Sequence, residues 1–74
     1  MNRMAEYCRL EARALMAQAE ACRLRAQATK YRNAPPDQCR ADFDAYQALA
    51  AQCVETAEEN FNLANLCDRD EVTA

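Results

Sequence analysis

Small and apolar residues recur at alternating steps of four and three residues along the first part of the chain. This is the heptad spacing of a helix that buries one side against a partner helix. We call this set the inner stripe, and it consists of Met1, Ala5, Cys8, Ala12, Leu15, Ala19, Cys22, Ala26 and Thr29. A second set, the outer stripe, lies on the opposite side at about 100° per residue. It consists of Tyr7, Leu10, Ala14, Ala17, Ala21, Leu24, Ala28 and Tyr31. The pattern predicts a long helix over about residues 2–33 with two faces to cover.

The only interruption of this helical pattern is the pair Pro35 and Pro36. Proline lacks a backbone donor and disfavours helical geometry in the residue before it, so we expect a turn over residues 34–36. The rest of the chain has no glycine and is rich in strong helix formers, which predicts a second helix over about 36–67. Acidic residues follow Cys67 at the negative pole of that helix, so we expect a loose tail over 68–74.

The second helix carries an inner stripe of its own at the same spacing: Cys39, Phe43, Tyr46, Ala50, Cys53, Ala57, Asn60, Ala64 and Cys67. A short connection makes the two helices antiparallel neighbours, so the layers pair Ala5 with Cys67, Cys8 with Ala64, Ala19 with Cys53, and Cys22 with Ala50. We therefore predict an all-α fold, a single domain over 1–74 formed by a two-helix antiparallel hairpin. It resembles the alanine-rich antiparallel coiled coils of small helical bundles. Asn60, the one fully polar side chain of its stripe, is expected to fix the register.

The outer stripe nearly matches its own reverse. Read antiparallel to itself, it pairs Tyr7 with Tyr31, Leu10 with Ala28, Ala14 with Leu24, and Ala17 with Ala21. A two-fold axis near Ala19 would join two hairpins through their first helices into a four-helix bundle. We expect the partner to be a second copy of this chain or another protein. The alternative is that the stripe is alanine on a solvated helix surface.

All five cysteines lie on the two inner stripes. Cysteine is small and readily buried, so one interpretation is five reduced core residues. A second is two disulfide staples, Cys8 with Cys67 and Cys22 with Cys53, because each pair lies in adjacent layers; Cys39 then stays free. With such staples the chain resembles the twin-cysteine helical hairpins of oxidising compartments, although it has thirteen residues between successive cysteines of a helix where those hairpins have nine. A third is a bundle that binds a soft metal such as Cu(I).

Composition excludes several classes of function. The net charge is −3 with both signs interspersed, which argues against nucleic-acid and membrane partners, and no run is long enough to span a bilayer. There is no histidine, glycine or serine, so imidazole relays and phosphate-binding glycine loops are absent, and we expect neither an enzyme nor a cofactor. We expect a cytoplasmic protein–protein interaction module, namely an adaptor, co-chaperone or inhibitor. In size and helical pattern it resembles the small co-chaperones of bacterial secretion systems and small phage-encoded inhibitors.

Overall fold

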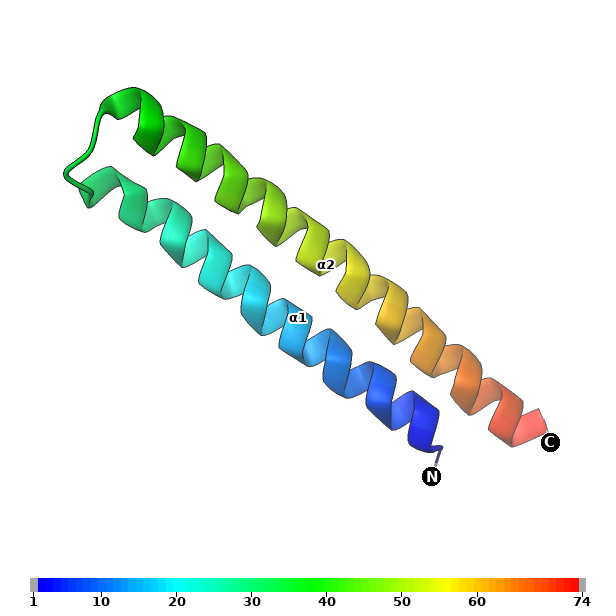
Figure 1. Ribbon diagram of the computed structural model, residues 1–74. Helices are drawn as coiled ribbons and strands as arrows, with labels where there is room; N and C mark the ends of the chain where they lie inside the picture. Colours follow the sequence, from blue (N-terminus) through cyan, green and yellow to red (C-terminus); the bar gives the residue numbers. More distant parts are fainter. Residues whose placement is uncertain (1, 74) are drawn as a thin grey trace.

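Two long antiparallel helices make up the fold. The computed structural model describes residues 2–73, and the side chains of residues 2–69. Helix α1 spans Arg3–Ala28, a single 3₁₀ turn η1 spans Thr29–Tyr31, and helix α2 spans Pro36–Thr73. The helices lie side by side, with both ends of the chain at the same end of the hairpin (Figure 1). The predicted all-α hairpin is confirmed, and residues 2–73 contain no strand.

Asn2 starts α1 and also ties it to α2. Its Oδ1 accepts hydrogen bonds from the backbone N–H groups of Met4, at 2.9 Å, and Ala5, at 3.2 Å, as an N-cap side chain does. Its Nδ2 donates to the backbone oxygen of Cys67 at 2.9 Å. One side chain therefore caps the first helix and anchors the far part of the second.

The chain leaves α1 gradually and enters α2 at the proline pair. The Thr29 hydroxyl is buried and donates to the Ala26 carbonyl oxygen at 2.6 Å. Arg32 then adopts extended geometry, with φ −79° and ψ 138°. Pro36 is the first residue of α2, where proline's fixed φ suits the helix and its missing N–H costs nothing. Arg32 Nη2 reaches back to Asp42 Oδ2 of α2 at 2.6 Å, which closes the turn on one flank of the hairpin.

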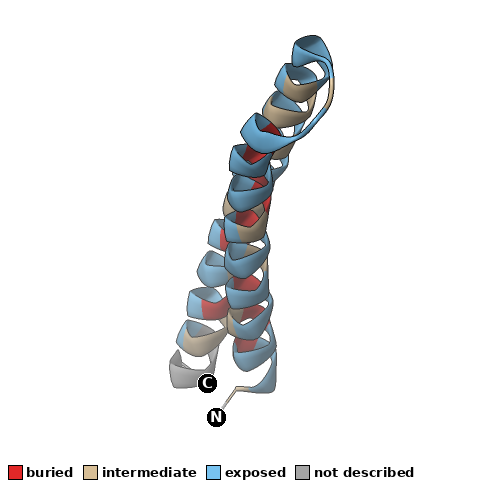
Figure 2. Ribbon diagram, turned by 90° about the vertical axis from the view of Figure 1, so that its left-hand side faces the viewer, coloured by how far each residue is buried: buried red, intermediate tan, exposed pale blue. Residues whose placement is uncertain are grey.

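The core is the row of small side chains where the two inner stripes meet. On α1 and η1, Ala5, Cys8, Ala12, Ala19, Cys22, Ala26 and Thr29 are buried, and on α2, Ala50, Ala57 and Ala64 are buried. Figure 2 shows the buried positions along the seam between the ribbons, with exposed positions turned outward. Leu15, the largest inner-stripe residue of α1 besides Met1, is half-buried, and Met1 lies outside the described residues. Alanine and cysteine thus form the helix contact, and they let two helices approach closely.

The predicted register is present at both core clusters. Ala5, Cys8 and Ala64 form one cluster with Cys67 against it. Ala19, Cys22 and Ala50 form the other, with Cys53 and Val54 against it. Asn60 behaves differently from the expectation that it would fix the register. Its Nδ2 donates to the Thr56 backbone oxygen of its own helix at 3.0 Å, so this bond does not join the helices.

Helix α2 continues to Thr73, past the end expected at Cys67, and takes in residues 68–73 that the sequence pattern places in a loose tail. Neither glycine nor proline follows Cys67 to stop the helix. Asp68, although near the negative pole, forms an ion pair with Arg9 of α1. The hydrogen bond to Asp68 raises the pKa of the Arg9 guanidinium above its usual range. Acidic residues near the C-terminal end of α2 were the reason to expect fraying there, and Arg9 of α1 offsets the charge of one of them.

Candidate protein-binding surface

The outer stripe lies on the side of α1 turned away from α2. Its four large side chains are well exposed: Tyr7 at 60%, Leu10 at 55%, Leu24 at 57% and Tyr31 at 89%. Ala14, Ala17 and Ala28 between them are exposed as well, and Ala21 is half-buried. All eight predicted residues therefore share one face, with Tyr31 carried on η1 at its end. Nothing within residues 2–69 of the hairpin covers the four large side chains.

The alternation of the two stripes explains why this face is left uncovered. The residues of α1 that face α2 are mostly small and fill the core, with Leu15 half-buried among them, whereas Tyr7, Leu10 and Leu24 lie on the opposite side. A soluble helix normally places charged residues there. An exposed apolar row at that place, with tyrosines near both ends, is a candidate surface for contact with another protein.

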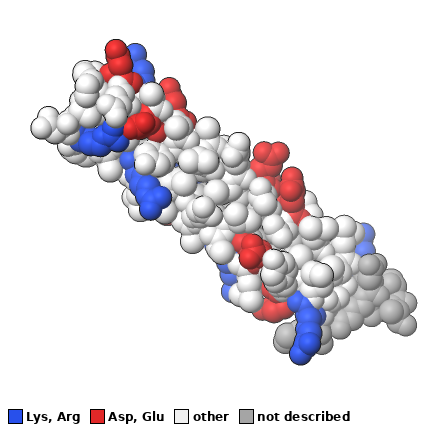
Figure 3. All heavy atoms as spheres, in the orientation of Figure 1, with Lys and Arg blue, Asp and Glu red and all other residues white. Residues whose placement is uncertain are grey.

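Charged residues flank the outer stripe without forming a patch of one sign. Glu20 and Arg23 pair within α1, with 3.7 Å between Oε2 and Nη1. Glu11, Arg13 and Arg25 are exposed, and among the described side chains none of the three has an ion-pair partner. On the face drawn in Figure 3, acidic and basic groups alternate along the molecule. These three charges are free to meet charges on a partner.

A hollow of about 330 Å³ adjoins the end of the outer stripe near the turn. It is lined by Arg25, Ala28, Thr29, Tyr31, Arg32 and Tyr46. Ala28 and Tyr31 belong to the outer stripe, whereas Tyr46 comes from α2, so this concavity depends on the packing of the two helices. The sequence places Tyr46 on the inner stripe of α2 and gave no signal that it would border the outer face of α1.

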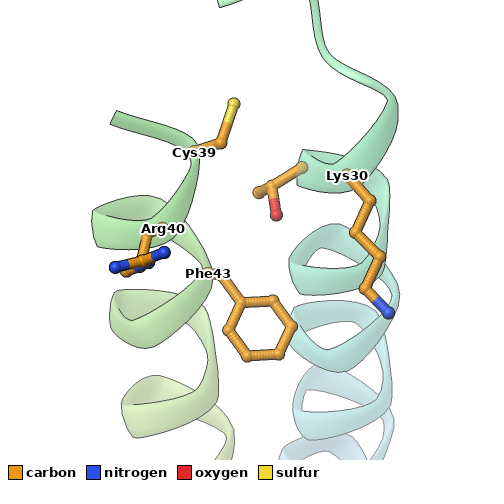
Figure 4. Close-up of a pocket in the computed structure, with 5 residues that line it drawn as sticks. Lys30, Cys39, Arg40 and Phe43 are labelled. Carbon is orange, nitrogen blue, oxygen red and sulfur yellow. The ribbon is translucent and has the colours of Figure 1, made fainter. Parts of the chain in front are cut away.

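A second hollow, of about 250 Å³, lies at the same end between the helices, and Thr29, Lys30, Cys39, Arg40 and Phe43 line it. In Figure 4 the Phe43 ring projects across the gap toward α1, while the charged groups of Lys30 and Arg40 point to opposite sides. The Cys39 thiol donates to the Ala34 carbonyl oxygen at 3.7 Å. The two cations do not converge, so this hollow lacks the arrangement that would hold an anion.

Helix α2 also exposes large apolar side chains. Leu49, Leu63 and Leu66 are each about half exposed. Gln52, Glu55 and polar residues like them occupy much of the remaining outer surface. The leucines of α2 are interrupted by polar side chains, unlike the continuous outer stripe of α1.

The five thiols are free, with Cys8 and Cys22 buried and Cys39, Cys53 and Cys67 half-buried. Within the described part of the chain, no group of three or more histidine, cysteine, aspartate or glutamate side chains is placed to hold a metal ion. The cysteines instead occur two by two, one pair in each core cluster, with Cys39 apart near the turn.

Comparison with known proteins gives no match to a family, to a curated protein or to a solved structure. Neither helix, over its described residues, combines the length and the apolar character that crossing a bilayer requires.

Proposed function

We propose that this chain is a non-enzymatic protein–protein interaction module that binds through the outer stripe, and that its partner is a second copy of itself, antiparallel, in a four-helix bundle. One observation carries the proposal: the hairpin fills its core with the inner stripes and leaves a continuous apolar row on α1 exposed. An isologous interface requires a surface that complements itself, and this row does.

The complementarity is one of size as well as position. In the antiparallel arrangement Leu24 faces Ala14 of the other copy, Leu10 faces Ala28, and Ala17 faces Ala21 around the two-fold axis. Large side chains set against small ones interdigitate without leaving voids.

The hollow near the turn supports the same arrangement. Tyr7 of one copy meets Tyr31 of the other at each end of the seam, next to the hollow that Arg25, Arg32 and Tyr46 border. A tyrosine ring entering there would lie against guanidinium groups and another aromatic ring, both of which are favourable neighbours. A hollow that accepts Tyr7 of the other copy would make the interface specific.

Charged residues beside the stripe also fit. In the antiparallel seam Glu11 of one copy comes near Arg25 of the other, and Arg13 comes near Glu20. Each attraction occurs twice because of the two-fold axis. Exposed pairs contribute at most about 1 kcal/mol each, so they select orientation more than they add affinity.

A different protein on the same stripe is the second candidate, in the manner of an adaptor, a co-chaperone or an inhibitor. Tyr7 and Tyr31 favour it, because exposed tyrosines often anchor contacts between unlike chains.

Native mass spectrometry of the purified full chain tests both candidates. The proposal predicts a complex of twice the 8.4 kDa chain mass at micromolar concentration. A one-to-one complex with an unlike protein would support the second candidate instead. A single chain at micromolar concentration, bound to nothing, would overturn the proposal.

A further inference from the structure

The two core clusters point to a covalent chemistry that is separate from the binding surface. We propose that Cys8 with Cys67, and Cys22 with Cys53, are two dithiol–disulfide couples that staple the hairpin when a low-molecular-weight disulfide oxidises them. Each couple has its two members in a single packed cluster, one on each helix. Cys39, near the turn, belongs to neither cluster and stays a thiol.

The two cysteines of each couple have the same relative positions on the two helices. In each, the two cysteines lie three residues out of the facing register, so that Cys8 faces Ala64 while Cys67 faces Ala5, and Cys22 faces Ala50 while Cys53 faces Ala19. The clusters contain these neighbours. The same arrangement thus occurs twice, two heptads apart, in the two clusters that make up much of the core.

The expected separation suits a disulfide. An offset of three residues along antiparallel helices is about 4.5 Å at a rise of 1.5 Å per residue. Helices that pack through alanine have axes about 8 Å apart, and each Cα lies about 2.3 Å from its axis, which leaves about 3.4 Å between the Cα atoms across the contact. The two components combine to a Cα–Cα distance of about 5.6 Å, near the most common value for disulfides. The small residues of the seam are therefore what bring the thiols within bonding range.

Each couple also has one sheltered and one accessible thiol. Cys8 and Cys22 on α1 are 5% and 6% exposed, whereas Cys67 and Cys53 on α2 are half-buried. The accessible thiol can react first with a small disulfide in solution, and the sheltered thiol can then complete the bond. In both couples the accessible thiol is on α2 and the sheltered thiol is on α1.

The reaction is ordinary thiol–disulfide exchange. The thiolate of Cys67 or Cys53 attacks one sulfur of the small disulfide, which forms a mixed disulfide and releases one small thiolate. The thiolate of Cys8 or Cys22 then attacks the α2 sulfur, forms the staple and releases the second small thiolate. Each staple oxidises two protein thiols, reduces one small disulfide to two thiols, and transfers the two protons through solvent. In a reducing cytoplasm both couples would stay open until the balance of small thiols shifted.

The test exposes the folded full chain, at low concentration, to oxidised glutathione, quenches it with acid, and alkylates it under denaturing conditions. We expect one alkylated thiol per chain, at Cys39, and a mass lower by the hydrogens of two disulfides. Cleavage after arginine, lysine and glutamate separates all five cysteines onto different peptides. We expect linked peptides joining Cys8 to Cys67 and Cys22 to Cys53, and a higher midpoint of thermal unfolding for the oxidised chain.

Two variants make the result specific. With Cys8→Ala, Cys22 and Cys53 should still join, leaving Cys39 and Cys67 alkylated; alanine already fills many inner-stripe positions, so the hairpin should tolerate it. Leu24→Glu, which breaks the proposed seam between copies, should leave both linkages unchanged. The disulfide proposal is therefore tested independently of the proposed dimer. Five alkylated thiols after oxidation, a linkage through Cys39, or equal yields of every pairing in the folded chain would overturn the proposal.

Discussion

Replacing Leu24 with glutamate should dissociate the pair of hairpins while leaving each hairpin folded. Leu24 is 57% exposed and belongs to the outer stripe, so the hairpin core does not depend on it. Full burial of a leucine stabilises by about 1.5–3 kcal/mol, so burying the exposed half in a seam contributes about 1 kcal/mol. The two-fold axis places this residue in the seam twice, which makes the loss about 2 kcal/mol and weakens association at least about 30-fold. Burial of two carboxylates against the alanines of the other copy increases the loss further.

Sedimentation equilibrium over a concentration series measures the effect, and circular dichroism checks the helix content. Leu66→Glu on α2 is the matched control, since Leu66 is 50% exposed and the substitution adds the same charge. We expect the control to associate as the native chain does. Unchanged association of the Leu24 variant, or equal weakening in both variants, would refute the assignment of the seam to the outer stripe.

Three further sets of substitutions address the hairpin itself. Ala19→Leu, at a fully buried position, should force the helices apart and lower the free energy of unfolding by about 1–3 kcal/mol in thermal melts, while Ala48→Leu on the exposed side of α2 should change it little. Asn2→Ala should lower the free energy of unfolding by about 1–2 kcal/mol, because it removes both the helix cap and the hydrogen bond to α2. Asn2→Asp keeps the cap and should recover part of that loss. Equal losses in the two variants would show that the cap contributes nothing to stability. Reversing the charge of Arg32 or of Asp42 alone should lower stability, and exchanging both charges together should restore most of that loss. The coupling energy in a double-mutant cycle should be below about 1 kcal/mol, because both side chains are partly exposed.

The heptad spacing predicted the hairpin because its determinants are local. Steps of four and three mark the face of each helix that is buried, and the proline pair fixes where the chain reverses. Together these set the layers, which is why Ala5 and Cys8 lie with Ala64, as the pattern requires. The outer stripe was equally predictable, because its residues recur at steps of three and four on the side of the helix opposite the inner stripe.

The features that the sequence did not predict depend on contacts between the helices. The extension of α2 past Cys67 is accompanied by the pairing of Asp68 with Arg9, two residues whose proximity follows only once the hairpin has closed. Asn2 could be recognised as a cap by its residue type, but its bond to the Cys67 carbonyl could not. The hollow beside Tyr31 needs Tyr46 from the other helix. Asn60 was expected to act between the two helices of the hairpin. Its side-chain amide instead donates a hydrogen bond to a backbone carbonyl oxygen on the preceding turn of its own helix.

A distance measurement between two copies tests the antiparallel seam most directly. A genetically encoded spin-labelled amino acid replaces Gln27, an exposed residue beside the outer stripe, so that all five cysteines stay in place. With the two-fold axis near Ala19, the two labelled positions are displaced by about 24 Å along the helix axis, at a rise of 1.5 Å per residue. The same label at Gln18, next to the axis, gives a displacement of only about 3 Å. We expect pulsed electron paramagnetic resonance to give a long distance between labels at Gln27 and a short one between labels at Gln18. Short distances from both positions, as in a parallel pair, or no interaction between labels from either, would contradict the antiparallel seam.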